Sequence, residues 1–225
     1  MQLSVPIHDL WWLISRASAV IALVLITATV LLGLAMATRT LRDPGRRRTA
    51  MKLHEDIALV SLAMIAVHGL TLLGDAWLKP GLSGIAVPFS MPYRPLYTGL
   101  GIIAGYLALL LGPSFYLRRR IKARRWRNVH RLTPVVWVFA VVHTLGAGTD
   151  SGSLWLRAIV LSPIPVLAYL LTVRLLSGGS SAEAGRRRQA SAGATVAARL
   201  QPDSAAGARR RVAGQLQPER GPAAR

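Results

Sequence analysis

Four histidines are the residues of this sequence best suited to chemistry. His54 and His68 lie 14 residues apart, and His130 and His143 lie 13 residues apart, all within or beside long apolar stretches. Ionisable side chains inside a membrane are costly and usually mark functional sites. A neutral imidazole offers one ring nitrogen as a metal ligand. The pattern therefore predicts two metal-ligating groups on each of two helices.

The elements that must position these histidines are membrane-spanning helices. A hydrocarbon core of about 30 Å needs roughly 20 helical residues. The stretches that meet this requirement are Leu10–Ala37, Leu53–Leu73, Leu96–Leu117, Val129–Leu145 and Leu156–Leu176. We therefore predict an all-α fold, a polytopic membrane bundle of about five transmembrane helices within residues 1–177.

Positive charge lies almost wholly on one side of these helices. The sequence has 28 Lys and Arg, of which 24 fall in 39–52, in 118–131 or from 174 onward. The positive-inside rule makes these segments cytoplasmic, with the N-terminus outside and the C-terminus inside. This distribution accounts for the net charge of +19, so we expect no nucleic-acid partner.

The direction of the two histidine-bearing helices predicts how their side chains pair. Both helices leave a basic segment, so both run outward and are parallel. At about 1.5 Å per residue the spacings correspond to about 21 and 19.5 Å along the axis. We expect His54 opposite His130 near the inner boundary (the inner pair) and His68 opposite His143 near the outer boundary (the outer pair). Each pair offers the two axial nitrogens that a six-coordinate b-type haem needs, which predicts two haems.

One feature of the spacing resists this interpretation. Thirteen residues leave His130 and His143 about 140° apart around an ideal helix. Pro134 removes a helical hydrogen bond four residues after His130 and can distort that turn. Tighter, 3₁₀-like winding there would bring the two side chains onto one face.

Haem is not the only interpretation of the four histidines. Each one alone is typical of a hydrogen-bonded packing residue. Zinc or copper is disfavoured because each pair offers only two ligands and the sequence has no cysteine to add a third. The lack of cysteine also excludes disulfides, zinc ribbons, thiolate-ligated iron–sulfur clusters and a cysteine nucleophile. His8, ahead of the first helix, is expected to be solvated.

The sequence resembles the ferric reductase-like transmembrane family, which includes the membrane part of NADPH oxidases and the haem subunit of the periplasmic methionine sulfoxide reductase system. The resemblance rests on the two histidine pairs and on the stretch WRNVHRLT from Trp126 to Thr133, and it covers about residues 10–176. It implies two b haems between the histidine-bearing helices, one for the inner pair and one for the outer pair.

The sequence also departs from the family pattern. Full-length reductases of this family continue into a cytoplasmic flavin and nicotinamide domain and commonly have six helices. Here we count five, and only a basic tail follows them. The resemblance therefore implies a stand-alone membrane core whose electron donor is a separate cytoplasmic flavoprotein or a quinol.

Two arginines are candidates to bind haem carboxylates, because a guanidinium matches a carboxylate bidentately. Arg16 lies at a depth similar to that of His68, and Arg131 directly follows His130. Snorkelling of Arg16 toward the outer headgroups is an equally good interpretation. For Arg131, retention of positive charge in the cytoplasmic loop explains the residue equally well.

Two segments outside the spans have distinctive composition. The connection Gly74–Pro95 is rich in Gly and Pro, and we expect it to cover the outer face of the bundle. Residues 178–225 are Ala, Gly, Arg and Gln with almost no large apolar side chain, so we expect a disordered basic cytoplasmic tail.

These observations predict a multi-pass oxidoreductase, or its electron-transfer component, in the inner (plasma) membrane of a bacterial-type cell. Electrons would pass from a cytoplasmic-side donor through two bis-histidine b haems to an outer acceptor. One alternative is a single-haem or quinol-linked membrane subunit of a dehydrogenase or sulfoxide reductase. A second, from another class, is a cofactor-free membrane transporter or assembly protein that uses its histidines for protons.

Overall fold

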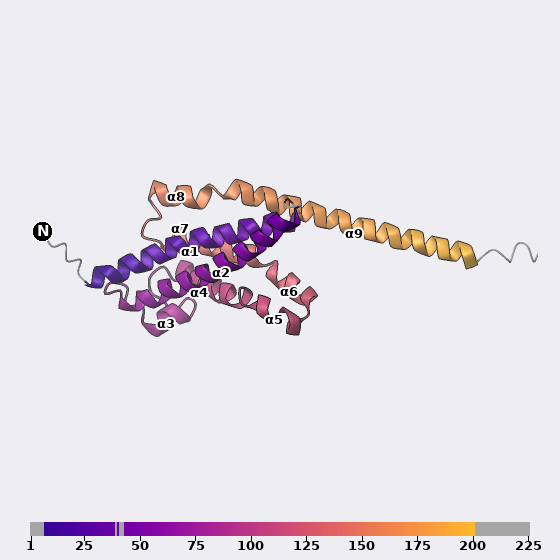
Figure 1. Cartoon of the computed structure of the whole chain (residues 1–225). Helices are drawn as coiled ribbons and strands as arrows, with labels where there is room; N and C mark the ends of the chain where they lie inside the picture. The colour runs from indigo at the N-terminus through magenta and orange to yellow at the C-terminus, as the bar shows by residue number, and fades with distance from the viewer. Residues whose placement is uncertain (1–6, 39, 41–42, 201–225) are drawn as a thin grey trace, which may run out of the picture. The chain divides into compact units, whose positions relative to one another are not determined.

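The computed structural model describes residues 7–38, 40 and 43–200, which form helices joined by turns (Figure 1). The elements in order are α1 (Ile7–Ala37), α2 (Pro44–Thr71), the 3₁₀ turn η1 (Leu72–Gly74), α3 (Gly81–Ala86), α4 (Pro95–Leu111), α5 (Ser114–Ile121), α6 (Ala123–His130), α7 (Thr133–Ala147), α8 (Leu154–Leu161) and α9 (Ile164–Leu200). The chain divides into two compact units, Met1–Arg174 and Leu175–Arg225. The histidine pairs belong to the first unit.

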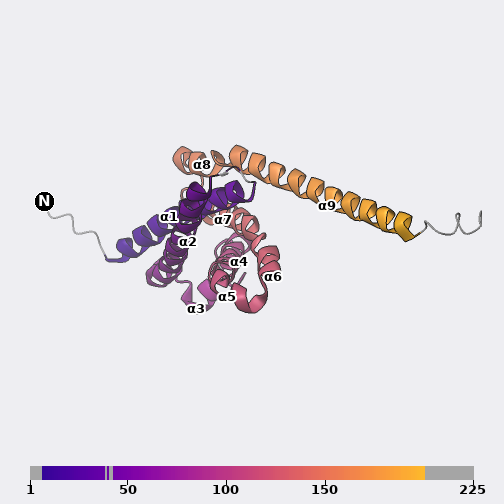
Figure 2. The same ribbon diagram turned by 45° about the vertical axis from the view of Figure 1, so that its right-hand side comes forward.

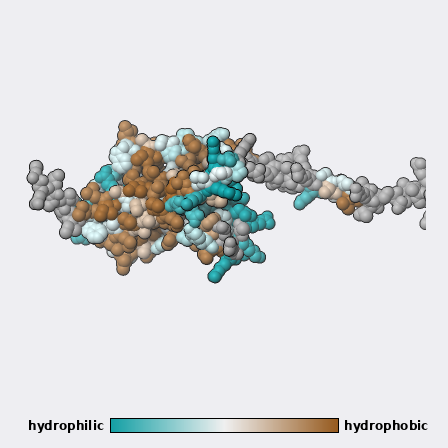
Figure 3. All heavy atoms as spheres, in the orientation of Figure 1, coloured by the Kyte–Doolittle hydropathy of each residue, from teal (hydrophilic) through white to brown (hydrophobic). Residues whose placement is uncertain are grey.

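Five segments of the described chain are long and apolar enough to cross a membrane. They are Asp9–Ala37, Pro44–Gly74, Pro95–Leu117, Arg124–Ala147 and Leu154–Leu176. Many of their large apolar side chains are exposed, as lipid contact requires (Figure 3). Hydrophilic residues gather at the end of the bundle where α5 and α6 lie. The predicted all-α membrane bundle of five spanning helices is confirmed.

Local sequence explains where the first histidine-bearing helix begins. Asp43 is the N-cap of α2, and its carboxylate accepts hydrogen bonds from the backbone N–H groups of Gly45 and Arg46. Pro44 occupies the first helical position, where a missing N–H costs nothing. The start of α2 is therefore defined ten residues before His54.

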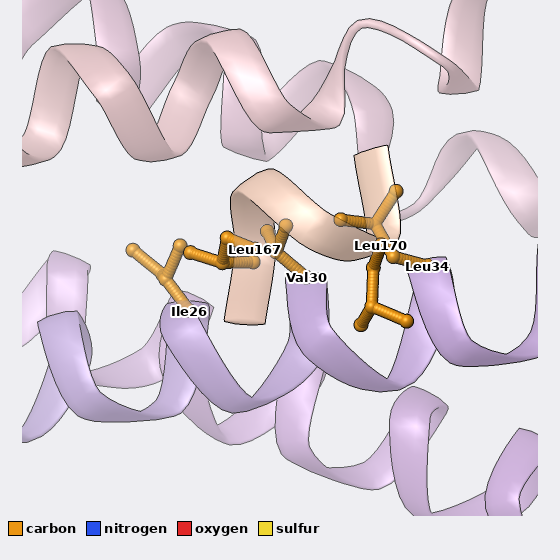
Figure 4. Packing of buried hydrophobic residues seen from close by; sticks show 5 residues of the cluster. All are labelled: Ile26, Val30, Leu34, Leu167 and Leu170. Atoms are coloured by element: carbon orange, nitrogen blue, oxygen red, sulfur yellow. The ribbon is translucent and has the colours of Figure 1, made fainter. Parts of the chain in front are cut away.

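Two helix pairs form the centre of the first unit. Helix α1 packs along α2, and α4 packs along α7 (Figures 1 and 2). The first half of α9 joins α1 through a buried cluster, which is drawn in Figure 4 and consists of Ile26, Val30, Leu34, Leu167 and Leu170. A smaller cluster of Ala104, Leu111 and Val136 joins α4 to α7.

The connection from Gly74 to Pro95 contains a short helix, α3, and several tight turns. The carboxylate of Asp75 accepts hydrogen bonds from the backbone N–H groups of Trp77 and Leu78 at 2.8 and 2.9 Å. The Trp77 ring packs edge-on against Tyr93. These local contacts give the connection a defined structure beside the outer pair.

The region expected to be a disordered tail differs from expectation over part of its length. Residues 178–200 are helical as the continuation of α9. Ala, Arg and Gln have high helix propensity, which favours helix even where no apolar face is available for packing. The remainder of that expected tail, 201–225, lies outside the described residues.

Candidate haem-binding site

The structure brings the four histidines together in two pairs. The ring centroids of His54 and His130 are 6.2 Å apart, and those of His68 and His143 are 6.3 Å apart. Pairing in this register requires the two histidine-bearing segments to be parallel and matched in depth. The structure therefore has the side-chain pairing that the two spacings predict.

A break in the second histidine-bearing segment removes the angular difficulty of the 13-residue spacing. Helix α6 ends at His130 and α7 begins at Thr133. Across the break, the N–H of Leu132 donates to the Val129 carbonyl and the N–H of Val135 donates to the Leu132 carbonyl. Both bonds have the three-residue spacing of tighter winding. The distortion expected near Pro134 therefore turns His143 onto the same side as His130.

Three of the four rings are oriented by backbone carbonyls of the helices that carry no paired histidine. Nδ1 of His54 donates to the Thr29 carbonyl at 2.9 Å. Nδ1 of His68 donates to the Ser15 carbonyl at 3.0 Å, and Nδ1 of His143 donates to Tyr97 at 2.9 Å. Because a carbonyl can only accept, Nδ1 carries the proton in each ring. The other nitrogen, Nε2, keeps the lone pair that binds a metal.

His130 is held differently. Its Nδ1 is buried and has no hydrogen-bond partner among the described residues. Its ring stacks on Trp126, with centroids 4.9 Å apart and ring planes 21° from parallel. The indole N–H of Trp126 donates to Ser114 Oγ at 3.1 Å. Stacking on an anchored indole thus holds the His130 ring, on which the Leu111 carbonyl also acts.

The outer pair lines a cavity of about 420 Å³. Its walls come from α1, α2, α4 and α7, and the Gly74–Pro95 connection adds Leu78, Gly84, Ile85, Met91 and Tyr93. The lining is mostly apolar, with a few polar groups, as is typical of cofactor sites. The connection expected to cover the outer face thus forms part of the wall beside His68 and His143.

Arg16 reaches the same cavity but already has a partner. Its guanidinium contacts the carboxylate of Asp150 at 2.5 and 2.6 Å, and it lies over the Trp12 ring at 5.0 Å. Both Arg16 and Asp150 line the cavity. The pair ties α1 to the turn after α7 at the level of the outer histidines. A haem carboxylate at Arg16 would have to share the guanidinium with Asp150.

The second arginine predicted for a site, Arg131, caps the end of α6 and is exposed. It lies close enough to Arg174 for the two charges to repel each other, and the charge of Arg174 also reaches His130. The charge of Arg174 therefore acts on the His130 side of the inner pair. Arg174 was not singled out from the sequence, where it is only a basic residue near the end of the fifth span.

Close helix approach beside His143 depends on a glycine. A Cβ atom at Gly101 would lie 2.4 Å from His143 Nδ1, far inside contact distance. At Gly105, one turn further along α4, the nearest atom to such a Cβ is Ile65 Cγ2 at an ordinary 3.7 Å. The two glycines resemble a helix-packing motif in the sequence, but only Gly101 makes room for a histidine ring.

The donor set of each pair suits a haem. Among the described residues no group of three or more His, Cys, Asp or Glu is placed to hold a metal ion, so a bare ion would be under-coordinated. Metal–imidazole bonds are about 2.0–2.1 Å long, which places facing nitrogens roughly 4 Å apart across one ion. Centroid separations of 6.2 and 6.3 Å accommodate that arrangement. A porphyrin brings the four remaining donors itself.

Comparison with known proteins gives one family match. The family described as "Ferric reductase like transmembrane component" matches residues 17–141. This range is more than half of the chain and includes three of the paired histidines, while His143 lies two residues beyond it. No curated protein and no solved structure gives a match.

Proposed function

Because the chain belongs to the family of ferric reductase like transmembrane components, whose match indicates a membrane electron-transfer domain, we propose that it carries two bis-histidine b-type haems. The inner haem is held by His54 and His130, and the outer haem by His68 and His143. The observation that carries the proposal is the pair of matched ring separations, 6.2 and 6.3 Å, at two levels of one bundle.

The orientation of the rings supports this assignment. Three Nδ1–H groups donate to backbone carbonyls, so Nε2 is the nitrogen that each neutral imidazole would offer as a ligand. A packing histidine has no need for a second imidazole at metal-bridging distance. Both pairs have one, which is the arrangement expected of ligands.

A bis-histidine haem supplies one-electron chemistry at its iron. The chain's own contribution is to hold the rings and to exclude water from them. Apolar side chains dominate the wall around the outer pair, and the 14-residue spacing of His54 and His68 separates the two levels by about 21 Å. Two centres at that separation extend over most of a hydrocarbon core of about 30 Å.

We place the electron donor on the basic side of the bundle and the acceptor on the side of the outer cavity. The donor is a separate cytoplasmic flavoprotein or a quinol. The protein is a multi-pass membrane protein, and the inner (plasma) membrane of a bacterial-type cell is the location that we propose. In sealed proteoliposomes, reduction from the basic side should reduce a membrane-impermeant ferric chelate on the other side. If the chelate stays ferric, the proposed direction of electron transfer is wrong.

Haem content is the decisive test. Protein purified from a haem-sufficient host should show a b-type spectrum on reduction and contain two haems per chain by pyridine extraction. One haem per chain would favour the single-haem alternative. A haem-free preparation of folded protein would overturn the proposal and leave the transporter alternative.

Single substitutions separate the two pairs. His68→Leu or His143→Leu should remove the outer haem and leave the inner one, so that the haem content falls from two to one per chain. His54→Leu should remove the inner haem. His8→Leu is the matched control because His8 is the one histidine outside the pairs, and it should retain two haems.

A further inference from the structure

Helix α1 presents a residue with a hydroxyl group to each histidine of α2. Ser15 faces His68 and Thr29 faces His54, and in both cases Nδ1 of the ring contacts the backbone carbonyl, at 3.0 and 2.9 Å. Ser15 and Thr29 are 14 residues apart, as are His54 and His68. The two helices therefore meet in an antiparallel register in which one spacing matches the other. Where the backbone is concerned, the two contacts are equivalent.

The side chains at these two positions make different contacts. The hydroxyl of Thr29 donates to the Leu25 carbonyl of its own helix at 2.8 Å. The hydroxyl of Ser15 lies 3.0 Å from Nδ1 of His68 and donates to the His68 carbonyl at 3.4 Å. Both Ser15 and Thr29 are buried, so the chain supplies the partners of these hydroxyl groups. Of the two positions, it is Ser15 that adds a side-chain contact to a histidine ring.

The tautomer of His68 that can bind a metal determines the role of the Ser15 hydroxyl. A ligand needs a lone pair on Nε2, so the proton of the neutral ring is on Nδ1. This N–H then donates to both oxygens of Ser15, the carbonyl and Oγ, while the hydroxyl proton is directed to the His68 carbonyl. The Ser15 carbonyl also accepts from Ser18 Oγ at 3.0 Å. The hydroxyl therefore provides a second acceptor beside a carbonyl that is shared between donors.

We propose that Ser15 is a positioning residue whose hydroxyl orients His68 and lowers the midpoint potential of the outer haem. Donation from Nδ1 to an additional acceptor increases the basicity of a metal-bound imidazole, and a more basic ligand favours the oxidised iron. This inference rests on the proposed function, because it needs a haem at the outer pair. A lower outer potential gives electrons that leave the bundle a larger driving force toward the outer acceptor.

The test is a redox titration of purified, haem-loaded Ser15→Ala. Loss of the hydroxyl removes one acceptor of the His68 N–H and leaves the carbonyl, so the outer potential should rise while the inner potential and the content of two haems stay unchanged. The expected size is a several-fold change in the ratio of oxidised to reduced haem, where tenfold corresponds to about 59 mV for one electron. His54→Leu, which keeps the outer haem alone, assigns the two potentials.

Thr29→Val is the matched substitution on the same helix. Valine keeps the shape of threonine and the backbone carbonyl that His54 contacts, and the hydroxyl that is lost bonded the Leu25 carbonyl. Both potentials should therefore match those of the unsubstituted protein. A rise of the inner potential in Thr29→Val equal to the rise of the outer potential in Ser15→Ala would overturn the inference, because altered packing of α1 would then explain both.

The remaining outcomes separate the inference from the proposed function. If the unsubstituted protein lacks an outer haem, the proposed function fails. If two haems are present and Ser15→Ala leaves the outer potential unchanged, or lowers it, only the inference about Ser15 fails. Should Ser15→Ala not fold or not retain the outer haem, Ser15→Cys serves instead, since a thiol is a weak acceptor. It should raise the outer potential by a smaller amount, and an unchanged potential would contradict the inference.

Discussion

The outer and inner pairs have nearly equal ring separations but different surroundings. At the outer pair both Nδ1 atoms donate to carbonyls, and a cavity with an ion pair at one side adjoins the rings. At the inner pair His54 donates to the Thr29 carbonyl, His130 stacks on Trp126, and the charge of Arg174 acts on His130. The comparison teaches that ring spacing alone does not determine the environment of a ligand. The carbonyls and aromatic groups of neighbouring helices do.

The largest expected effect is at Gly101. A methyl group there overlaps the His143 ring, so the ring must leave its position and lose the Tyr97 carbonyl. Gly101→Ala should retain one haem per chain instead of two, with the inner haem intact. Gly105→Ala is the matched control on the same helix and should retain both, as measured by pyridine extraction and by elution as folded protein. Two haems per chain in Gly101→Ala would show that the outer pair does not depend on the space left by this glycine.

A smaller effect is expected at the ion pair beside the outer cavity. Asp150→Asn leaves the Arg16 guanidinium without its carboxylate in a partly buried place. We expect a loss of about 1 kcal/mol of stability, discounted for the exposure of Arg16, seen as a fall of a few degrees in Tm. Arg16→Lys keeps the positive charge but lacks the planar guanidinium, so its Tm should fall less. Equal Tm values in all three proteins would show that the pair contributes nothing.

The inner pair should tolerate the equivalent glycine change better. A Cβ at Gly33 would lie 3.3 Å from His54 Cε1, compared with 2.4 Å at Gly101. A shift of a few tenths of an ångström relieves that contact, so Gly33→Ala should keep both haems and alter only the inner potential slightly. A redox titration measures this. Complete loss of the inner haem would show that the two pairs are equally intolerant of added volume.

The smallest effect is expected at the exposed edge of the inner region. The Tyr116 hydroxyl donates to Glu55 Oε1 at 2.5 Å, but Tyr116 is 58% exposed. Surface substitutions usually change stability by no more than about 0.5 kcal/mol. Tyr116→Phe should therefore keep two haems and an unchanged Tm. A clear fall in haem content would show that the inner environment extends to this surface contact.

Several features of the site could be predicted because they depend on residue type and periodicity. Apolar length predicts the spans, and the depths of His54, His68, His130 and His143 follow from their spacing along parallel helices. Pro134 marks the region where the winding tightens. Continued helix through residue 200 was not predicted, because low apolar content argues against a core but not against helix.

Other features had no sequence signal. A backbone carbonyl is present at every residue, so nothing in the letters distinguishes Thr29 or Tyr97 as the acceptor for a histidine. The contact of Asp150 with Arg16 joins residues far apart in sequence, so no spacing predicts it.

Composition and spacing by themselves determined that this chain crosses a membrane several times and presents imidazoles at two matched depths. Both properties depend only on position along the helix axis, which apolar length and the rise per residue give. Only the tertiary structure decided how each imidazole is oriented. The orientation depends on whether the neighbouring helix places a carbonyl, an aromatic ring or a glycine beside the imidazole. The two histidine pairs therefore follow from the order of residues, and the difference between the pairs follows from the packing of α1 and α4 against them.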